Sequence, residues 1–414
     1  MRQLVFTALV MAFLGPMTAP VSGGTQGWSD WRGPARAAFS PDVPNSLPSP
    51  LTPLWTRPLT GAGLAGLAVA DNRVVLADKS DDAKQDVFRC LDAASGRELW
   101  TLTYPAPEKM DYGNAPRATP VIHNGLVYLL GAFGHLHCVR LDKGEVIWKR
   151  DFVKDFGGTV PDWGFCSSPL AVDKMLIINP GGPTASIVAL DLVPGETVWE
   201  TPGDKAAYGA LILATLGACR QIVGYDETSV GGWRPESGER LWRLVPPEEG
   251  EYNVPTPVVV GGKLFLATEM NCARLYGFDA QGCILPKPVA TNEDFYPDMI
   301  SPVLAENLVL GGSGSLMCLD INRGLEIAWE SEDEHYCEYF TAITGNGRIL
   351  ITSIDGWLHL LETDAHKHHV ISRINLFPGL SEQPRQPWSH PALVGNLYFI
   401  RNQARAYCFQ LQEH

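Results

Sequence analysis

A tryptophan that recurs every 43 to 51 residues constrains the fold of this chain more than any other feature. The last gap, 87 residues, is about two such periods. Because the segments between these tryptophans read as short strands and turns, a period of this length predicts the blades of a β-propeller. The series consists of Trp55, Trp100, Trp148, Trp199, Trp242 and Trp329.

Each unit of the repeat contains the signals of four strands. The segments 90–100, 138–148, 189–199, 232–242 and 318–329 each contain a strand, a polar turn with glycine, and a second strand with the tryptophan. Two-residue turns such as Asn124-Gly125 separate two earlier apolar strands. A Ser/Thr-Pro step such as Thr119-Pro120 or Ser168-Pro169 stands before most of them, where proline costs no ladder hydrogen bond. One unit therefore predicts a four-stranded antiparallel blade.

The number of units predicts eight blades. Units begin near 66, 119, 168, 209, 256, 301, 341 and 390. The last unit has only three strands before the chain ends, and residues 51–59, with Trp55, supply the fourth. We therefore expect an all-β, eight-bladed propeller over residues 51–414, closed by an N-terminal strand in the last blade, which removes its exposed edges. Blades five and seven lack the tryptophan, with Leu285-Pro286 and Val370-Ile371 in that stretch, and we expect weaker contacts there.

The first residues predict export. Arg2 precedes an apolar run over residues 4–14, and Val21-Ser22-Gly23 is the best cleavage site, so residues 1–23 are interpreted as a signal peptide; an uncleaved anchor is the alternative. Residues 24–50 form a Pro-rich N-terminal arm. We expect a periplasmic or secreted monomer. No cysteine precedes Cys90, and no later stretch has 18 apolar residues, so neither a lipid anchor nor membrane insertion is expected.

The charge of the chain bears on its partners. Removing residues 1–23 removes one arginine and no acid, which changes the formal charge from −14 to −15. A negative field repels phosphate backbones, so nucleic acid is not expected as a partner. An envelope or secreted protein is the expected partner.

The nine cysteines are interpreted as free thiols. Cys90, Cys138, Cys318 and Cys408 occupy one repeat position. Such positions lie in different blades, too far apart for a disulfide. The one plausible disulfide joins Cys272 and Cys283, which share a blade. The shared position is filled elsewhere by other small residues, Ala189, Gly232 and Gly277.

Three of the repeat segments, Leu91–Trp100, Leu190–Trp199 and Leu319–Trp329, resemble the tryptophan-docking repeat of the pyrroloquinoline-quinone (PQQ)-like propellers. That family includes quinoprotein alcohol dehydrogenases and the outer-membrane assembly factor BamB. The opening Trp31-Arg32-Gly33-Pro34 and the stretch from Asp162-Trp163-Gly164 to Ser168-Pro169 resemble a group of exported bacterial propellers. The resemblance covers residues 28–414. It implies that each tryptophan docks on a neighbouring blade near its glycine turn, which is a structural role.

The resemblance leaves enzymatic chemistry unsupported. The family's dehydrogenases hold a quinone with calcium beside a vicinal Cys-Cys disulfide, and this chain has neither Cys-Cys nor a Cys-x-x-Cys-His haem motif. We therefore expect no cofactor and no catalytic residue. His135 and His137 share one face of a strand, and three histidines crowd one turn, where a solvated turn is favoured over a metal site. Those three are His366, His368 and His369.

One group of candidate site residues follows from the predicted fold. Residues just before the innermost strands should gather on one face of the disc, near its axis. They could bind a ligand or a peptide, or they could be rim residues bonded to their own loops. The candidates are Arg117, Trp163, Asn253, Asp298, Glu338 and Trp388.

Three functions are considered. The first is a non-catalytic binding or scaffold propeller of the periplasm or cell envelope, which contacts another protein through one disc face. The alternatives are a quinone- or metal-dependent oxidoreductase, and a sensor of a ligand or carbohydrate. The missing Cys-Cys argues against the oxidoreductase.

Overall fold

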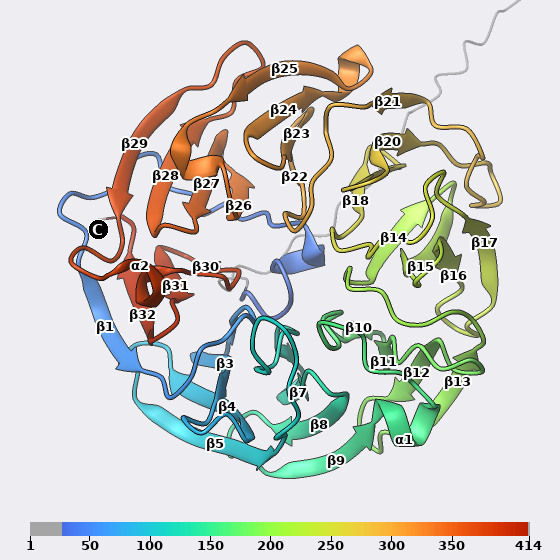
Figure 1. The fold of residues 1–414 in the computed structure, drawn as a ribbon, viewed down its shortest axis with the longest axis horizontal. Helices are drawn as coiled ribbons and strands as arrows, with labels where there is room; N and C mark the ends of the chain where they lie inside the picture. The colour runs from blue at the N-terminus through green and yellow to red at the C-terminus, as the bar shows by residue number, and fades with distance from the viewer. Residues whose placement is uncertain (1–26, 413–414) are drawn as a thin grey trace, which may run out of the picture.

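The computed structural model describes residues 27–412, and these form a ring of eight sheets (Figure 1). Every sheet has four strands, and every pair of neighbouring strands is antiparallel. The predicted eight-bladed propeller is thus confirmed, and each innermost strand begins within three residues of the predicted start. The predicted signal peptide lies outside the described residues.

The first four blades follow one another from the N-terminal side. Blade one has β2 (Ala68–Ala70), β3 (Arg73–Lys79), β4 (Gln85–Asp92) and β5 (Glu98–Pro105). Blade two has β6 (Val121–His123), β7 (Leu126–Leu130), β8 (His135–Arg140) and β9 (Val146–Asp151). Blade three has β10 (Leu170–Val172), β11 (Met175–Ile178), β12 (Ile187–Asp191) and β13 (Thr197–Thr201). Blade four has β14 (Ile212–Leu216), β15 (Cys219–Tyr225), β16 (Val230–Trp233) and β17 (Arg240–Leu244).

The last four blades complete the ring. Blade five has β18 (Val258–Val260), β19 (Lys263–Thr268), β20 (Cys272–Tyr276) and β21 (Ala290–Asn292). Blade six has β22 (Val303–Ala305), β23 (Leu308–Gly311), β24 (Leu316–Asp320) and β25 (Glu326–Ser331). Blade seven has β26 (Phe340–Gly345), β27 (Arg348–Ser353), β28 (Trp357–Glu362) and β29 (Val370–Asn375). Blade eight has β30 (Ala392–Val394), β31 (Leu397–Arg401), β32 (Arg405–Gln410) and β1 (Pro53–Pro58).

The helices of the described residues are short, and all but the first lie between two strands in the sequence. They are the 3₁₀ turns η1 (Pro34–Arg36), η2 (Ile321–Arg323) and η3 (Glu334–Tyr336), with α1 (Phe152–Phe156) and α2 (Glu382–Arg385). Asp151 caps α1, since its carboxylate accepts hydrogen bonds from the amides of Val153 and Lys154.

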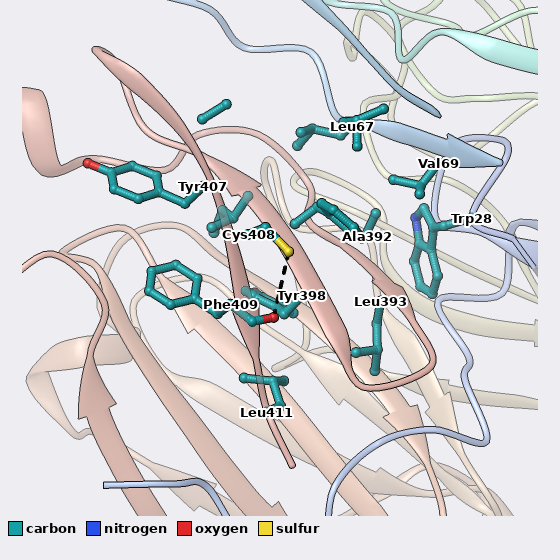
Figure 2. Close-up of a cluster of buried hydrophobic side chains, with 14 of the residues drawn as sticks. Trp28, Leu67, Val69, Ala392, Leu393, Tyr398, Tyr407, Cys408, Phe409 and Leu411 are labelled. Atoms are coloured by element: carbon teal, nitrogen blue, oxygen red, sulfur yellow. Dashed lines mark hydrogen bonds between the residues drawn. The ribbon is translucent and has the colours of Figure 1, made fainter. Parts of the chain in front are cut away.

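Blade eight is closed by both ends of the chain, as predicted. Strand β1 pairs with β32, and Trp55 lies opposite Cys408. Figure 2 shows Cys408 inside the apolar cluster of this blade, to which Trp28 of the N-terminal arm also belongs. The closing blade therefore buries residues from three distant parts of the sequence.

Four docking tryptophans make the same contact with the following blade. In each case the indole N–H donates to a backbone carbonyl before the glycine turn, for example Trp55 to Ala93 at 2.8 Å. The glycine has φ between 66° and 71°, and a Cβ on it would lie 2.4 to 2.7 Å from the ring. The turn therefore needs glycine both for its conformation and for the close approach of the ring. The four pairs are Trp55 on Gly96, Trp100 on Gly144, Trp148 on Gly195 and Trp199 on Gly238.

The other two tryptophans dock in modified ways. Trp329 donates to the Asp364 carbonyl of blade seven at 2.7 Å. Trp242 donates to the side-chain oxygen of Gln221 in its own blade at 2.6 Å, and the amide of Gln221 donates to the Gly282 carbonyl of blade five at 3.0 Å. Gln221 thus relays the contact that the indole makes directly elsewhere.

The residue opposite the tryptophan is small wherever the tryptophan is present. Cys90 lies opposite Trp100, and Ala189 lies opposite Trp199. The prediction for blade five was wrong, because the strand register puts Leu275 at this position rather than Gly277. Blades five and seven have leucine here because Ala290 and Ser372 stand opposite in place of the indole. The larger leucine on one strand compensates for the smaller residue opposite it, so the packing stays dense. The leucine of blade seven is Leu360.

Blade five also replaces the hydrogen bond of the missing indole. The side-chain amide of Asn292 on β21 donates to the Leu325 carbonyl in the turn of blade six at 2.8 Å. Asn292→Ala should lower the free energy of unfolding by about 1–2 kcal/mol, because the carbonyl of the buried Leu325 loses its donor. Urea unfolding measures this, with the exposed Thr291→Ala as the control on the same strand. An unchanged midpoint would contradict the assignment.

All nine cysteines are free, including the pair Cys272 and Cys283. Burial raises the pKa of each of four thiols to about 12, so these thiols are both covered and un-ionised at neutral pH. We expect them to resist labelling in the native protein and to react at once after denaturation. Mass mapping after thiol labelling checks this, and rapid native labelling of any of the four would contradict the packing. They are Cys90, Cys138, Cys318 and Cys408.

Candidate functional site

The topology of the blades defines one face on which the candidate residues lie. Strands alternate in direction within a blade, so every connection from an outermost strand to the next innermost strand crosses the same face of the ring. The turns between second and third strands lie on that face too. We call the part of this face around the axis the channel mouth.

The N-terminal arm occupies the axis of the ring below the channel mouth. In Figure 1 the blue turn η1 stands in the centre, surrounded by the innermost strands. Hydrogen bonds from residues 28–42 reach all eight blades. The partners in blade order are Val69, Ile122, Ser168, Leu211, Thr256, Pro302, Thr344 and Gly395.

Arg36 is the main anchor of the arm. Its guanidinium pairs with both carboxylate oxygens of Asp30, at 2.9 and 2.8 Å, and is almost fully buried. It also donates to the carbonyls of Ser168 at 3.1 Å and Leu211 at 2.6 Å, and to that of Pro169. Burial raises the pKa of Asp30, and the charge of Arg36 opposes that rise. The ion pair therefore depends on both partners being present.

The Trp-Arg-Gly-Pro motif at the start of the arm has a structural role here. The Arg32 guanidinium is buried and donates to the Pro302 carbonyl at 2.6 Å, and the Trp31 indole donates to Thr256 at 3.1 Å. Gly33 has φ 71°, and a Cβ on it would lie 2.6 Å from the Trp28 ring. Sequence reasoning singled out this motif without assigning it to the axis.

Three of the six predicted site residues line one cavity at the channel mouth. Asp298, Glu338 and Trp388 come from the loops before β22, β26 and β30 and surround a space of about 280 Å³. The ring of Tyr339 stacks on Trp388, with centroids 5.4 Å apart and planes 27° from parallel. Sequence reasoning missed Tyr339, although it stands directly before β26. We call this space the mouth cavity.

Trp163 lies apart from that cavity, in a second group. Its ring packs against Tyr252, Tyr208 and Tyr112, with centroids 4.4, 5.3 and 6.4 Å away. Tyr112 is 82% exposed and Tyr252 45% exposed. These four residues, from the loops before β6, β10, β14 and β18, are called the aromatic patch.

The remaining two predicted residues bond to loops, as the rim alternative expects. Arg117 donates to the carbonyls of Asp111 and Gly113 at 3.0 and 2.9 Å, so it holds the loop that presents Tyr112. Asn253 is buried, and its amide donates to the carbonyls of Asp226 and Glu227. Both residues therefore hold loops of the channel mouth in place.

The histidines offer no shared ligand position. His137 is buried against Tyr104, with centroids 4.5 Å apart, while His135 is half-buried at the start of the same strand. In the turn after β28, His366 is exposed and His369 bonds to Glu362 at 2.9 Å. Across residues 27–412, no three His, Cys, Asp or Glu side chains are grouped so as to hold a metal ion.

A quinone with calcium fits these residues poorly. The mouth cavity offers two carboxylates, whereas calcium takes about six to eight oxygen ligands. The sequence also has no vicinal cysteine pair. The arm fills the axis beneath, with Arg36 and Arg32 bonded to the surrounding blades.

Comparisons with known proteins agree with the fold. A family model described as outer membrane protein assembly factor BamB matches residues 83–331. No curated protein sequence matches the chain. Within the part of the chain that the structure describes, no helix has the length and hydropathy needed to span a bilayer.

Three solved structures illustrate how general the fold is. BamB from Moraxella catarrhalis has 17% identity and a TM-score of 0.60, covering 87% of this chain and 99% of that one. Quinohemoprotein alcohol dehydrogenase from Comamonas testosteroni has 12% identity and a TM-score of 0.65, covering 94% and 81%. The computationally designed Ika8 protein has 11% identity and a TM-score of 0.58, covering 84% and 98%. Identities this low establish the fold alone.

Proposed function

Because the chain belongs to the propeller family described as outer membrane protein assembly factor BamB, we propose that it is a non-catalytic scaffold that binds another protein of the periplasm or cell envelope. The site of binding is the channel-mouth face. The arm closes the axis, so the accessible surface at the mouth consists of the loops. A rigid ring that presents loops on one face is well suited to binding a partner.

The aromatic patch is the observation that carries this proposal. Exposed tyrosine and tryptophan side chains are enriched at protein interfaces, because they bury large area at small entropic cost. Tyr112 holds a positive φ of 61°, next to Gly113, and projects into solvent. Arg117 fixes that loop through three carbonyls. Tyr112, the most exposed member of the patch, is thus presented by a loop that Arg117 holds in place.

The test is capture of a partner from envelope extract with the mature chain. A specifically captured protein, once purified, should bind at least tenfold more weakly to the Trp163→Ala, Tyr252→Ala double variant. The control is Val193→Ala, which removes an exposed side chain from a glycine turn on the opposite face. Equal loss in both variants, or binding unchanged by either, would contradict the proposed face.

A second experiment separates the scaffold from an oxidoreductase. We expect purified protein with calcium and PQQ to show no saturable quenching of Trp163 or Trp388 fluorescence and no alcohol-dependent dye reduction. Both tryptophans lie at the channel mouth, so a planar quinone stacked there would quench them. Saturable quenching that Trp163→Ala or Asp298→Ala removes, together with dye reduction, would overturn the scaffold. Quenching without turnover would favour a ligand sensor.

A further inference from the structure

We propose that the mouth cavity binds a guanidinium group, supplied by an arginine side chain of the partner. This inference rests on the proposed scaffold function and adds the chemistry of one recognition pocket. It follows from the size, the charge and the aromatic wall of the cavity.

The cavity is small and is lined by loops of three neighbouring blades. Its volume of about 280 Å³ lies just below the range of about 300–1,000 Å³ that is common for drug-sized ligands. Three blades contribute to it: Asp298–Ile300 and the turn Gly312-Ser313 from blade six, Cys337–Tyr339 from blade seven, and Trp388 from blade eight. The pocket is therefore formed where loops of three blades meet around one small space.

The charge of the cavity is negative and uncompensated. Within residues 27–412, neither Asp298 nor Glu338 accepts a hydrogen bond or joins an ion pair. Burial raises the pKa of Asp298, and no basic group opposes that rise. Burial raises the pKa of the nearby Glu269, and the negative charge of Asp298 raises it further. A cation in the cavity would relieve this repulsion.

Arg32 is a cation near the aromatic wall of the cavity, but it does not neutralise the two carboxylates. The charge of Arg32 acts on the pKa of Tyr339, yet Arg32 does not line the cavity. Its Nη2 donates to the Pro302 carbonyl at 2.6 Å, while its Nε and Nη1 are buried and have no hydrogen-bond partner in the structure of residues 27–412. The carboxylates of the cavity are left for a ligand.

The aromatic wall selects guanidinium over ammonium. The Trp388 indole N–H donates to Gln386 in its own loop at 3.2 Å, and the ring stacks on Tyr339. A planar, weakly hydrated guanidinium can stack on such rings and also donate to a carboxylate through two N–H groups. An ammonium is a compact and strongly hydrated charge that gains less from the rings.

Cys337 provides a direct readout of the cavity. It lines the space and is the one exposed thiol among the nine cysteines, all of which the structure describes. Its modification can be followed by peptide mass mapping in the purified chain with no partner present. The labelling of Cys337 can therefore be measured even if no partner is captured, and a partner can be captured even if the labelling test fails.

The first arm of the test measures charge. A methanethiosulfonate with a trimethylammonium group should modify Cys337 about tenfold faster than its sulfonate counterpart, after each rate is divided by that for a free thiol. Asp298→Asn with Glu338→Gln should bring this ratio close to one. Glu332→Gln, an exposed acid in the same loop that does not line the cavity, should leave the ratio within twofold.

The second arm measures the ligand. N-acetyl-arginine amide at millimolar concentration should slow the reaction of Cys337 with neutral iodoacetamide at least threefold, and the citrulline amide should not. The Trp388→Ala variant should lose this protection. Equal protection by the lysine amide would overturn the guanidinium assignment. No protection in the native chain, or protection that persists in the Asp298→Asn, Glu338→Gln variant, would overturn the site.

Discussion

Lowering the pH from 7 to 5 should destabilise the folded chain by about 2 kcal/mol for each of three buried histidines. Burial chiefly lowers the pKa of His137 and of His359 to about 4, and that of His390 to about 3. In the unfolded chain these groups protonate near pH 6.5. The unfolded state therefore binds more protons between pH 6.5 and about 4, and stability is lost as the pH falls through that window.

The surroundings of the three rings explain why each stays neutral. His390 lies beside the Arg32 charge and packs against Trp31, with centroids 5.2 Å apart. The charges of His135 and Lys149 oppose protonation of His137. For His359, His335 and Arg373 oppose protonation while Asp333 and Asp355 favour it, and burial outweighs both.

Urea unfolding at pH 7, 6 and 5 measures this effect. His359→Gln and His137→Gln should each flatten the pH dependence by about 2 kcal/mol between pH 7 and 5, whatever they cost at pH 7. His366→Gln, which replaces an exposed histidine, is the control variant. A slope that is flat in the native chain, or equal in all variants, would contradict the burial of these rings.

Arg36→Met should lower the free energy of unfolding by about 3–5 kcal/mol, because it leaves the Asp30 carboxylate in the axis without its cation. The carbonyls of Ser168, Leu211 and Pro169 lose their donor in the same step. For a described chain of this length the melting temperature should fall by roughly 5 °C. Differential scanning calorimetry measures the change.

A second substitution shows whether the charge is the cause. Asp30→Asn in the Arg36→Met background should recover part of the loss, because it removes the uncompensated charge. Arg323→Met breaks a pair with Glu326 in which both side chains are well exposed, and should change stability by less than about 0.5 kcal/mol. An Arg36→Met variant as stable as the native chain would show that the arm does not hold the ring together.

The repeat and its closure could be predicted because their signals are local. A blade is four strands close in sequence, and the tryptophan, its glycine turn and the short hairpins recur at one period. Counting periods gave eight blades, and the strand missing from the last unit pointed to Trp55. That the tryptophans dock on neighbouring blades was predicted from the family resemblance. The structure shows how they do so, through the indole hydrogen bond and the contact of the ring with the glycine.

The candidate site could be predicted only in outline. Placing residues before the innermost strands at one face was sound, since antiparallel order decides it. Which of them face a shared space depends on loop conformation, so Asp298 and Glu338 line one cavity while Trp163 joins a separate patch. Tyr339, which lines the same cavity and stacks on Trp388, was found only in the structure.

Two features were decided by the tertiary structure alone. Arg36 bonds to carbonyls 132 and 175 residues away, and no periodic pattern marks which surface of a ring will receive an arm. Asn292 makes the hydrogen bond that an indole makes in other blades. This could not be predicted from the repeat, because asparagine does not resemble tryptophan. Local periodicity determines a blade because its strands bury one another in sequence order. The axis is filled by whichever distant side chain satisfies the inward-facing carbonyls of several blades at once, and that condition exists only after the ring has closed.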